Sequence, residues 1–447
     1  MSHYANKGDL TTGSVRGHLL RLTLPMVTSL FAIISFQLVN TFYISRLGTG
    51  ELAAISFTFP VTYTIFSLFL GFGIATSSVV SRLLGEKREA DVQRVATHSL
   101  LLVLIFSLFL SGIGLVFWKG IFSLLGADAS ALALLKDYIL IYFSGMFFIC
   151  LPVVVNAALR ARGDAMTPAI ILISSALFNA ALDPVLIYGL FGFPRMELQG
   201  AAISTFLANC GATLTGLYVM HRRGLISVGY LKQLSEFKDS MKRLLVIALP
   251  AGITSALPSV VNSVILALLA QTGAEAVAAF GVASRVEAFC FIVMMALASG
   301  MAPVIGQNWG AKQYDRVRET LKNAIAFCVI WSILVAIILG IFANFFAGLF
   351  SNELGVQKYI ILYFLIVPFS YALSNIANGW ASAFNAMGKP QYAAGTLFLK
   401  LIVLGIPALY LGHAIAGVAG LFWSIAIVNL IAGIATHIFG WKYATPR

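Results

Sequence analysis

Long apolar stretches alternate with short polar segments along the whole chain. Windows of about twenty apolar residues, the length that crosses the hydrocarbon core of a bilayer as a helix, recur twelve times. They lie at residues 22–45, 52–81, 96–118, 137–158, 167–190, 199–220, 244–270, 277–303, 323–347, 359–384, 391–412 and 416–440. This pattern predicts an all-α polytopic membrane protein with twelve transmembrane helices. No hydrophilic stretch is longer than the one around 221–243, which leaves no room for a separate soluble domain.

The second half of the chain repeats residues of the first half in the same apolar context. A spacing of 225 relates Leu24-Pro25 to Leu249-Pro250, Gly48 to Gly273, Gly85 to Gly310, Lys87 to Lys312, Val92 to Val317 and Gly163 to Gly388. The spacing is 221 between Tyr138 and Tyr359, a shift that a few inserted or deleted loop residues explain. Two copies of one membrane unit indicate a transporter with pseudo-symmetric lobes. We predict six-helix lobes at 1–221 and 244–447, joined by a cytoplasmic linker at 222–243.

Composition and charge support this class and give an orientation. The chain is 60% hydrophobic and only 10% charged, whereas soluble proteins are about a quarter charged. With the N-terminus placed inside, 22 of the 29 lysines and arginines fall in tails and loops of the inner face and 5 on the other face. The positive-inside rule therefore predicts that both termini are cytoplasmic. The net charge of +12 reflects topology and the anionic inner leaflet, so no nucleic-acid partner is expected.

Ionisable side chains at bilayer depth are functional candidates by default, because they are costly unless paired or hydrated. Four lie within spans: Asp183 in the fifth, Arg285 and Glu287 in the eighth, and Lys400 in the eleventh. Glu287 and Lys400 have opposite charges, and we expect a salt bridge that is structural or lines a hydrated cavity. We expect Arg285 to reach towards the headgroups.

The strongest candidate site lies in the fifth span. Asn179 and Asp183 are four residues apart and share a helix face, and Pro184 frees backbone carbonyls nearby. A carboxylate in such surroundings can take up a proton, or hold a sodium ion together with amide and carbonyl oxygens. The alternative is a buried aspartate that hydrogen bonds satisfy.

Two other spans carry amides in apolar surroundings. Gln37 and Asn40 are three residues apart in the first span, which Pro25 can kink. Asn262 lies in the seventh span on a polar stripe with Ser255 and Ser259. These side chains either sense what binds in a central passage or simply hold neighbouring helices together.

Short motifs along nearly the whole chain resemble the multidrug and toxic compound extrusion (MATE) family. The resemblance rests on Leu24-Pro25, Val39-Asn40-Thr41, Arg46-Leu47-Gly48, Asn179 through Pro184, and the paired loop motifs at Gly85 and Gly310. The run Ser284-Arg285-Val286-Glu287 is most similar to the DNA-damage-inducible (DinF-type) branch.

The resemblance implies a fold and an activity. It implies two six-helix lobes in a V around a central cavity, and alternating-access export of cationic or amphipathic compounds in exchange for protons or sodium ions. In related branches an aspartate in span one joins an aspartate and an asparagine in span five. Asp183 and Asn179 match the latter pair, Asn40 stands at the first position, and Pro25 matches the kinking proline. Candidates for the apolar and aromatic cavity wall are Phe36, Gln37, Phe42 and Tyr43.

Asn40 departs from the family pattern. An amide does not take up a proton at physiological pH and offers a cation only a neutral oxygen, so it resembles a permanently protonated aspartate. Either the chain is a variant that holds one protonation state, or it is a natural member whose coupling rests on Asp183. Our hypothesis is that Asn40 weakens or abolishes coupling and biases span one towards its protonated-state conformation.

Two other functions compete with this interpretation. A flippase for lipid-linked precursors, from the same superfamily, needs a strongly cationic cavity, but only Arg285 and Lys400 lie at depth. An enzyme needs a nucleophile with a base or a metal cluster, whereas the histidines are scattered and the cysteines isolated. We therefore expect no catalytic residue, no metal and no cofactor beyond the coupling ion. We expect a monomer in the cytoplasmic (inner) membrane of a prokaryote, with drugs and the bilayer as its partners.

Overall fold

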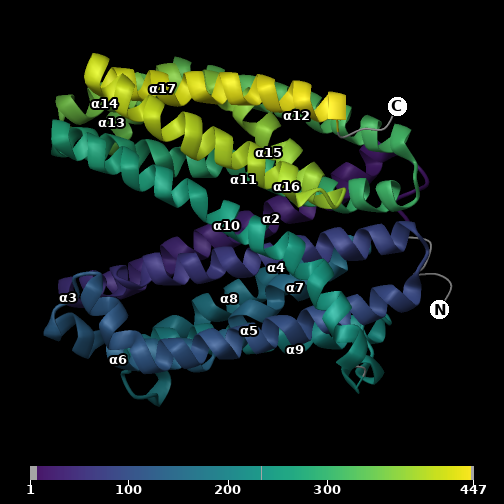
Figure 1. Ribbon diagram of the computed structural model, residues 1–447. Helices are drawn as coiled ribbons and strands as arrows, with labels where there is room; N and C mark the ends of the chain where they lie inside the picture. Colours follow the sequence, from purple (N-terminus) through teal and green to yellow (C-terminus); the bar gives the residue numbers. More distant parts are fainter. Residues whose placement is uncertain (1–7, 233, 444–447) are drawn as a thin grey trace. The chain divides into compact units, whose positions relative to one another are not determined.

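The computed structural model describes residues 8–232 and 234–443 of the 447-residue chain, and all regular structure in that part is helical (Figure 1). A bilayer offers no water to solvate backbone N–H and C=O groups, so an apolar chain satisfies them within helices. The first half contains α2 (Val15–Ser45), α3 (Thr49–Ser56), α4 (Thr58–Gly85), α5 (Glu89–Leu124), α6 (Ala129–Ser144), α7 (Met146–Ala161), α8 (Met166–Tyr188), η1 (Leu190–Gly192), α9 (Glu197–Arg222) and η2 (Val228–Lys232).

The second half follows the same plan with more breaks. It contains α10 (Leu234–Thr272), α11 (Ala274–Gly310), α12 (Tyr314–Ile341), α13 (Ala343–Phe350), α14 (Leu354–Ile366), η3 (Val367–Ser370), α15 (Tyr371–Ala386), α16 (Pro390–Phe398), η4 (Leu399–Gly405) and α17 (Ile406–Tyr443). Of these, η4 is a π-helix.

The helices account for the twelve predicted spans. Ten helices in the described part are long and apolar enough to cross a membrane, and α6 with α7 forms an eleventh span bent by 46°. The last of the ten, Pro390–Lys442, has 53 residues, which is far too long for one crossing at about 1.5 Å per residue. It breaks at Ala416 and Gly417, whose backbone angles are not helical, and thus contains two spans. The predicted all-helical, twelve-span fold is confirmed.

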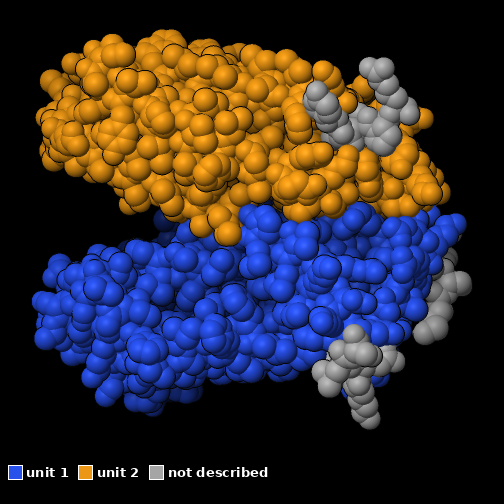
Figure 2. All heavy atoms as spheres, in the orientation of Figure 1, with its two compact units in different colours: residues 1–9, 24–252 blue, residues 10–23, 253–447 orange. Residues whose placement is uncertain are grey.

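The chain divides into two compact units (Figure 2). Unit 1 contains Leu24–Gly252 and the residues before Leu10, and unit 2 contains Leu10–Thr23 and Ile253–Arg447. This division differs in two places from the predicted lobes, 1–221 and 244–447. The start of α2 belongs to unit 2, and the linker with the start of α10 belongs to unit 1. Residues 1–7, 233 and 444–447 of the predicted regions lie outside the described residues.

Side-chain contacts to backbone groups explain why the division falls there. In unit 2, Leu10 N donates to Gln307 Oε1 at 2.9 Å, Asn308 Nδ2 to Leu10 O at 3.0 Å and Arg316 Nη1 to Gly13 O at 2.9 Å. These bonds fasten the segment before α2 to the junction of α11 and α12. These bonds were not predictable from the sequence, because amides and arginines next to a loop are usually solvated.

The linker is held in unit 1 in a similar way. The ring of buried His98 on α5 is hydrogen-bonded to Ser240 Oγ at 2.9 Å and to the carbonyl of Tyr230 at 3.1 Å. The ring of Phe237 packs edge-on against His98 with centroids 5.4 Å apart. The start of α10 therefore packs on α5.

The 225-residue repeat is visible in the backbone. Lys87 and Lys312 both have φ of 59°, and Gly163 and Gly388 have φ of 77° and 75°. Each lysine lies just beyond a helix end, where the next N–H bonds back across the turn: Arg88 N to Leu83 O at 3.0 Å, and Gln313 N to Asn308 O at 2.8 Å. Equivalent helices of the two halves therefore end with the same left-handed cap.

Lys87 and Lys312 adopt a backbone conformation that favours glycine. A left-handed conformation costs a residue with a Cβ roughly 1 kcal/mol relative to glycine, and both lysines are exposed. We expect Lys87→Gly and Lys312→Gly each to stabilise the protein by about 0.5–1 kcal/mol, measured as a rise in the midpoint of thermal unfolding in detergent. Lys87→Ala and Lys312→Ala keep the Cβ and serve as controls. A rise of the same size in the alanine variants contradicts the explanation.

Candidate functional site

Asp183 lies completely buried on α8, against α9. Its relative exposure is 0%, and Ser204 Oγ on α9 donates a hydrogen bond to Asp183 Oδ1. One turn earlier, Asn179 Nδ2 donates to Thr205 Oγ1 at 3.3 Å. Asn179 and Asp183 therefore share a face of α8, as predicted, and this face contacts the hydroxyl residues Ser204 and Thr205 of α9.

The loop before α8 fixes where this helix begins. Asp164 Oδ1 accepts from Thr167 N at 3.0 Å, and Asp164 forms an ion pair with Arg223 at the end of α9. Burial alone raises the pKa of Asp164, but hydrogen bonds from Thr167 and Arg223 outweigh burial and hold it below its usual value. Asp164 thus stays ionised and ties the start of α8 to the end of α9.

The C-terminal end of α2 packs beside the same region of α8. Tyr188 Oη donates to the carbonyl of Tyr43 at 2.7 Å, and Ile44 and Ile187 belong to one buried apolar cluster. Spans one and five cross the membrane in the same direction. Asn40 and Asp183 each lie one turn before the packed isoleucines, so we infer that they lie at the same depth on neighbouring helices.

Three buried oxygens at this place have no partner. Asn40 Oδ1, Asn179 Oδ1 and Asp183 Oδ2 are shielded from solvent and accept no hydrogen bond from the described part of the chain. Buried acceptors are almost always satisfied, so three at one level of unit 1 call for a donor or a cation. A proton on Asp183, or a sodium ion held by carboxylate and amide oxygens, meets that need.

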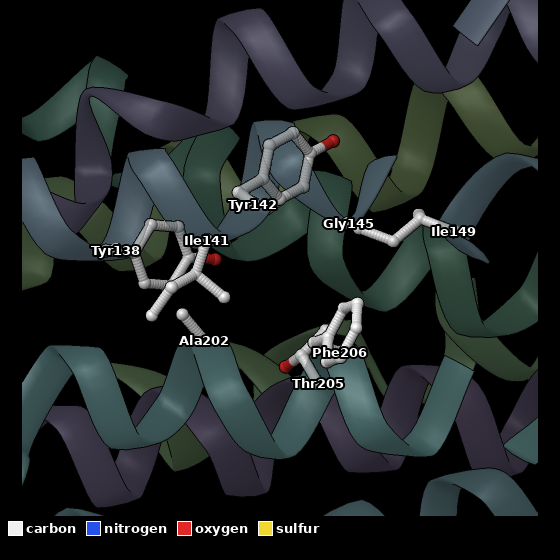
Figure 3. A pocket seen from close by; sticks show the side chains of 8 residues that line it. All are labelled: Tyr138, Ile141, Tyr142, Gly145, Ile149, Ala202, Thr205 and Phe206. Atoms are coloured by element: carbon white, nitrogen blue, oxygen red, sulfur yellow. The ribbon is translucent and has the colours of Figure 1, made fainter. Parts of the chain in front are cut away.

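A small aromatic pocket adjoins this site inside unit 1 (Figure 3). It is lined by Tyr138, Ile141, Tyr142, Gly145, Ile149, Ala202, Thr205 and Phe206. The rings of Tyr138 and Tyr142 are almost parallel, at an interplanar angle of 9° and a centroid distance of 6.5 Å. Thr205 lines the pocket and also binds Asn179, which connects the pocket to the candidate cation site.

The predicted kink residue and the predicted cavity residues of α2 differ in exposure. Pro25 is buried, Phe36 and Tyr43 are half-buried, and Gln37 and Phe42 are exposed. The Arg46 guanidinium lies 5.0 Å from the centroid of the Phe42 ring, so this ring already holds a cationic group.

Gln37 and Asn262 occupy equivalent positions of the repeat. They are 225 residues apart, on α2 and α10, and both are exposed. An exposed amide at bilayer depth is unfavourable against lipid, which indicates a water-accessible surface.

The charged residues of the second half do not form the expected salt bridge. Glu287 accepts a hydrogen bond from Tyr363 Oη, and Lys400 Nζ donates to Ser374 Oγ at 2.8 Å. The two charges interact electrostatically without contact between their charged atoms, because each has a nearer polar partner. Arg285 is exposed.

Comparison with known proteins identifies the family. The family model described as MatE matches residues 25–185 and 250–411, which is most of the chain. The chain belongs to the MatE family. The two matched segments begin at Pro25 and Pro250, which are 225 positions apart, the spacing of the internal repeat. Members of this family are transporters, so the expectation that the chain is not an enzyme is consistent with its membership.

Relatives within the MatE family carry different names. A protein of Shewanella oneidensis named FAD transporter is 37% identical over 96% of this chain and 95% of its own length. The multidrug export protein MepA of Staphylococcus aureus is 26% identical over 94% of this chain and 92% of its own length. A crystal structure of a mutant of the Vibrio cholerae MATE transporter VcmN matches with a TM-score of 0.92 at 28% identity, covering 97% of this chain and 98% of that one.

Several polar residues of this MatE protein carried no clear signal in the sequence. Ser204 and Thr205 are small hydroxyl residues, which in helices usually bond to their own backbone, and Ser204 does so too, with Ala201 O at 3.0 Å. Asn156 on α7 is buried, and its Oδ1 has no hydrogen-bond partner in the described part of the chain. Its sequence context gave no signal, because no second amide or carboxylate lies one helical turn away. The one available signal was that Ser204 and Thr205 fall in the span next to Asp183.

Proposed function

We propose that this MatE transporter is a cation-coupled antiporter. A proton or a sodium ion binds at Asp183, with Asn179 and Asn40 as neighbours, and its inward movement drives export of an amphipathic compound. The observation that carries the proposal is the set of three buried, unpartnered oxygens on these residues. They supply one negative charge and two neutral acceptors, which suits a monovalent ion.

Coupling follows from the position of the site on two helices. An ion at Asp183 removes the cost of a buried carboxylate and attracts the Asn40 amide, which changes how α2 packs beyond Pro25. A ligand shifts such an equilibrium only by its different affinity for the two conformations. Ion and cargo must therefore favour opposite conformations, and their binding alternates.

The cargo has two candidates. Cationic or amphipathic drugs are supported by the resemblance to the MATE family and by the relative named multidrug export protein MepA. FAD is the second candidate, supported by the 37% identical relative named FAD transporter. Ethidium and FAD both carry flat aromatic rings, which the exposed aromatic side chain of Phe42 can accept by weakly directional contacts.

Oligomeric state, family branch, location and orientation also belong to the proposed function. We propose a monomer of the DinF-type branch, in a prokaryotic inner membrane, with both termini cytoplasmic. The excess of lysine and arginine on one predicted face supports the orientation.

Transport in proteoliposomes tests this function. The purified chain is reconstituted, and uptake of ethidium and of FAD is followed in parallel under an imposed proton gradient, an imposed sodium gradient, or neither. We expect at least one cargo to accumulate against its own gradient with one of the two ions, and not without a gradient. Accumulation of neither cargo under either gradient contradicts the proposal, and cargo movement that ignores both gradients contradicts the coupling.

A further inference from the structure

Span eleven of the second half is the equivalent of span five of the first half, and the two spans carry buried side chains of opposite charge. The repeat of 225 makes Lys400 the counterpart of Ser175, one turn before Asn179 and two turns before Asp183. The first half thus presents a buried carboxylate on this span and the second half a buried ammonium. The two charged positions are not equivalent in the repeat, but each is a single buried charge on the corresponding span, and a buried ammonium attracts an anion instead of a cation.

The Lys400 ammonium has more N–H donors than hydrogen-bond partners in the described part of the chain. Its relative exposure is 5%, and among the described residues its Nζ has one hydrogen-bond partner, Ser374 Oγ at 2.8 Å. An ammonium has three N–H donors and no acceptor. Glu287, the nearby carboxylate, is occupied by Tyr363 Oη and forms no ion pair with Lys400. A buried charge without a contacting counter-charge is costly, which indicates that a ligand supplies the missing acceptor.

The backbone at Lys400 is unusual. Lys400 is the second residue of the π-helix Leu399–Gly405, a geometry that is rare and frequent at functional sites. Gly405 lies five residues after Lys400, and a Cβ there would be 3.0 Å from the carbonyl of Lys400. Glycine therefore permits the wide turn that sets the direction of this lysine.

Two apolar neighbours of Lys400 on its own helix are exposed, although the lysine itself is buried. Leu399 and Val403, next to it on the same π-helix, are 47% and 49% exposed. A wide π-turn that tightens to an α-turn changes the helical register by one residue, and this rotates the segment by about 100°. Binding of a ligand at Lys400 requires a change of this kind, because its side chain is 5% exposed in the structure.

We propose that Lys400 binds the phosphate groups of an anionic aromatic cargo. This inference rests on the second cargo candidate, FAD, whose pyrophosphate carries negative charge between two aromatic ends. The phosphate oxygens accept charge-assisted hydrogen bonds from the ammonium donors that Ser374 leaves free. Glu287 competes with the phosphate for the same positive charge, and removing its charge strengthens phosphate binding.

Three flavins separate the phosphate contact from the aromatic contacts. Binding of FAD, FMN and riboflavin to the chain in lipid nanodiscs is measured by flavin fluorescence. We expect Lys400→Met to weaken FAD and FMN binding about 10- to 100-fold, the usual range for a lost charge-assisted bond, and to leave riboflavin binding unchanged. Lys358→Met removes an exposed lysine of unit 2 and serves as the matched control with no expected effect.

A second variant keeps the test decisive if Lys400→Met does not fold. We expect Glu287→Gln to tighten FAD binding and to leave riboflavin binding unchanged, because it removes the competing carboxylate. FAD affinity that is unchanged in the variants, or equal losses for FAD and riboflavin, overturns the proposal. If the unaltered chain binds all three flavins alike, the flavin cargo stands and the phosphate contact fails. If it binds none of them, the flavin cargo fails as well.

Discussion

Asp183→Asn removes gradient-driven accumulation of cargo and leaves the protein folded. With one ion exchanged per cargo molecule and no membrane potential, a tenfold ion gradient supplies about 1.4 kcal/mol and sustains about a tenfold cargo gradient. The asparagine variant has no group that exchanges charge at the site, so the cargo ratio falls to about one. The amide has nearly the shape of the carboxylate, and its oxygen still accepts from Ser204 Oγ, the bond seen at Asp183 Oδ1.

Two measurements separate lost coupling from lost structure. Exchange of labelled for unlabelled cargo needs no net ion movement, so we expect the variant to retain it while accumulation disappears. Asp137→Asn, which removes an exposed carboxylate of α6 in the same unit, is the matched control and should accumulate cargo normally. Accumulation by Asp183→Asn at the level of the unaltered chain places the coupling site elsewhere.

The sequence predicted those features that follow from regular spacings along the chain. Apolar windows gave the twelve spans because a bilayer imposes the same length on every crossing. The 225-residue repeat predicted two equivalent halves, and the matching φ of 59° at Lys87 and Lys312 agrees with that prediction. Asn179 and Asp183 are one helical turn apart, so their common face followed from their spacing alone.

Features that depend on contacts between distant residues were not predictable. Ser204 binds Asp183 from another helix, and hydroxyl residues are too common in spans to mark a partner. Glu287 and Lys400 attracted a salt-bridge prediction because their charges are opposite, but a tyrosine and a serine lie nearer to them. Residues 10–23 belong to unit 2 and not to the predicted first lobe because of bonds such as the one between Leu10 and Asn308. These two residues are nearly 300 positions apart in the chain.

Asn40→Asp raises the number of ions exchanged per cargo molecule. Among the described residues, Asn40 Oδ1 and Asp183 Oδ2 are both buried without a partner. The apolar cluster that contains Ile44 and Ile187 holds their helices together. A second carboxylate at this place adds a second charge that only an inward-moving ion neutralises. With two ions per cargo, the same tenfold ion gradient sustains about a hundredfold cargo gradient in place of about tenfold. Simultaneous measurement of ion and cargo fluxes in proteoliposomes gives the ratio directly.

A matched variant shows whether the position or the added charge causes this change. Gln37→Glu places the same charge on α2 one turn away, on a side chain that is exposed and can stay hydrated throughout the cycle. A hydrated carboxylate gains little from an ion, so its occupancy does not distinguish the two conformations and adds nothing to the coupling. The hypothesis that Asn40 weakens coupling therefore requires that Asn40→Asp alone increases the ion ratio. An unchanged ratio means that Asp183 already carries the whole coupling, and that the amide at position 40 serves only to fill the ion's coordination shell.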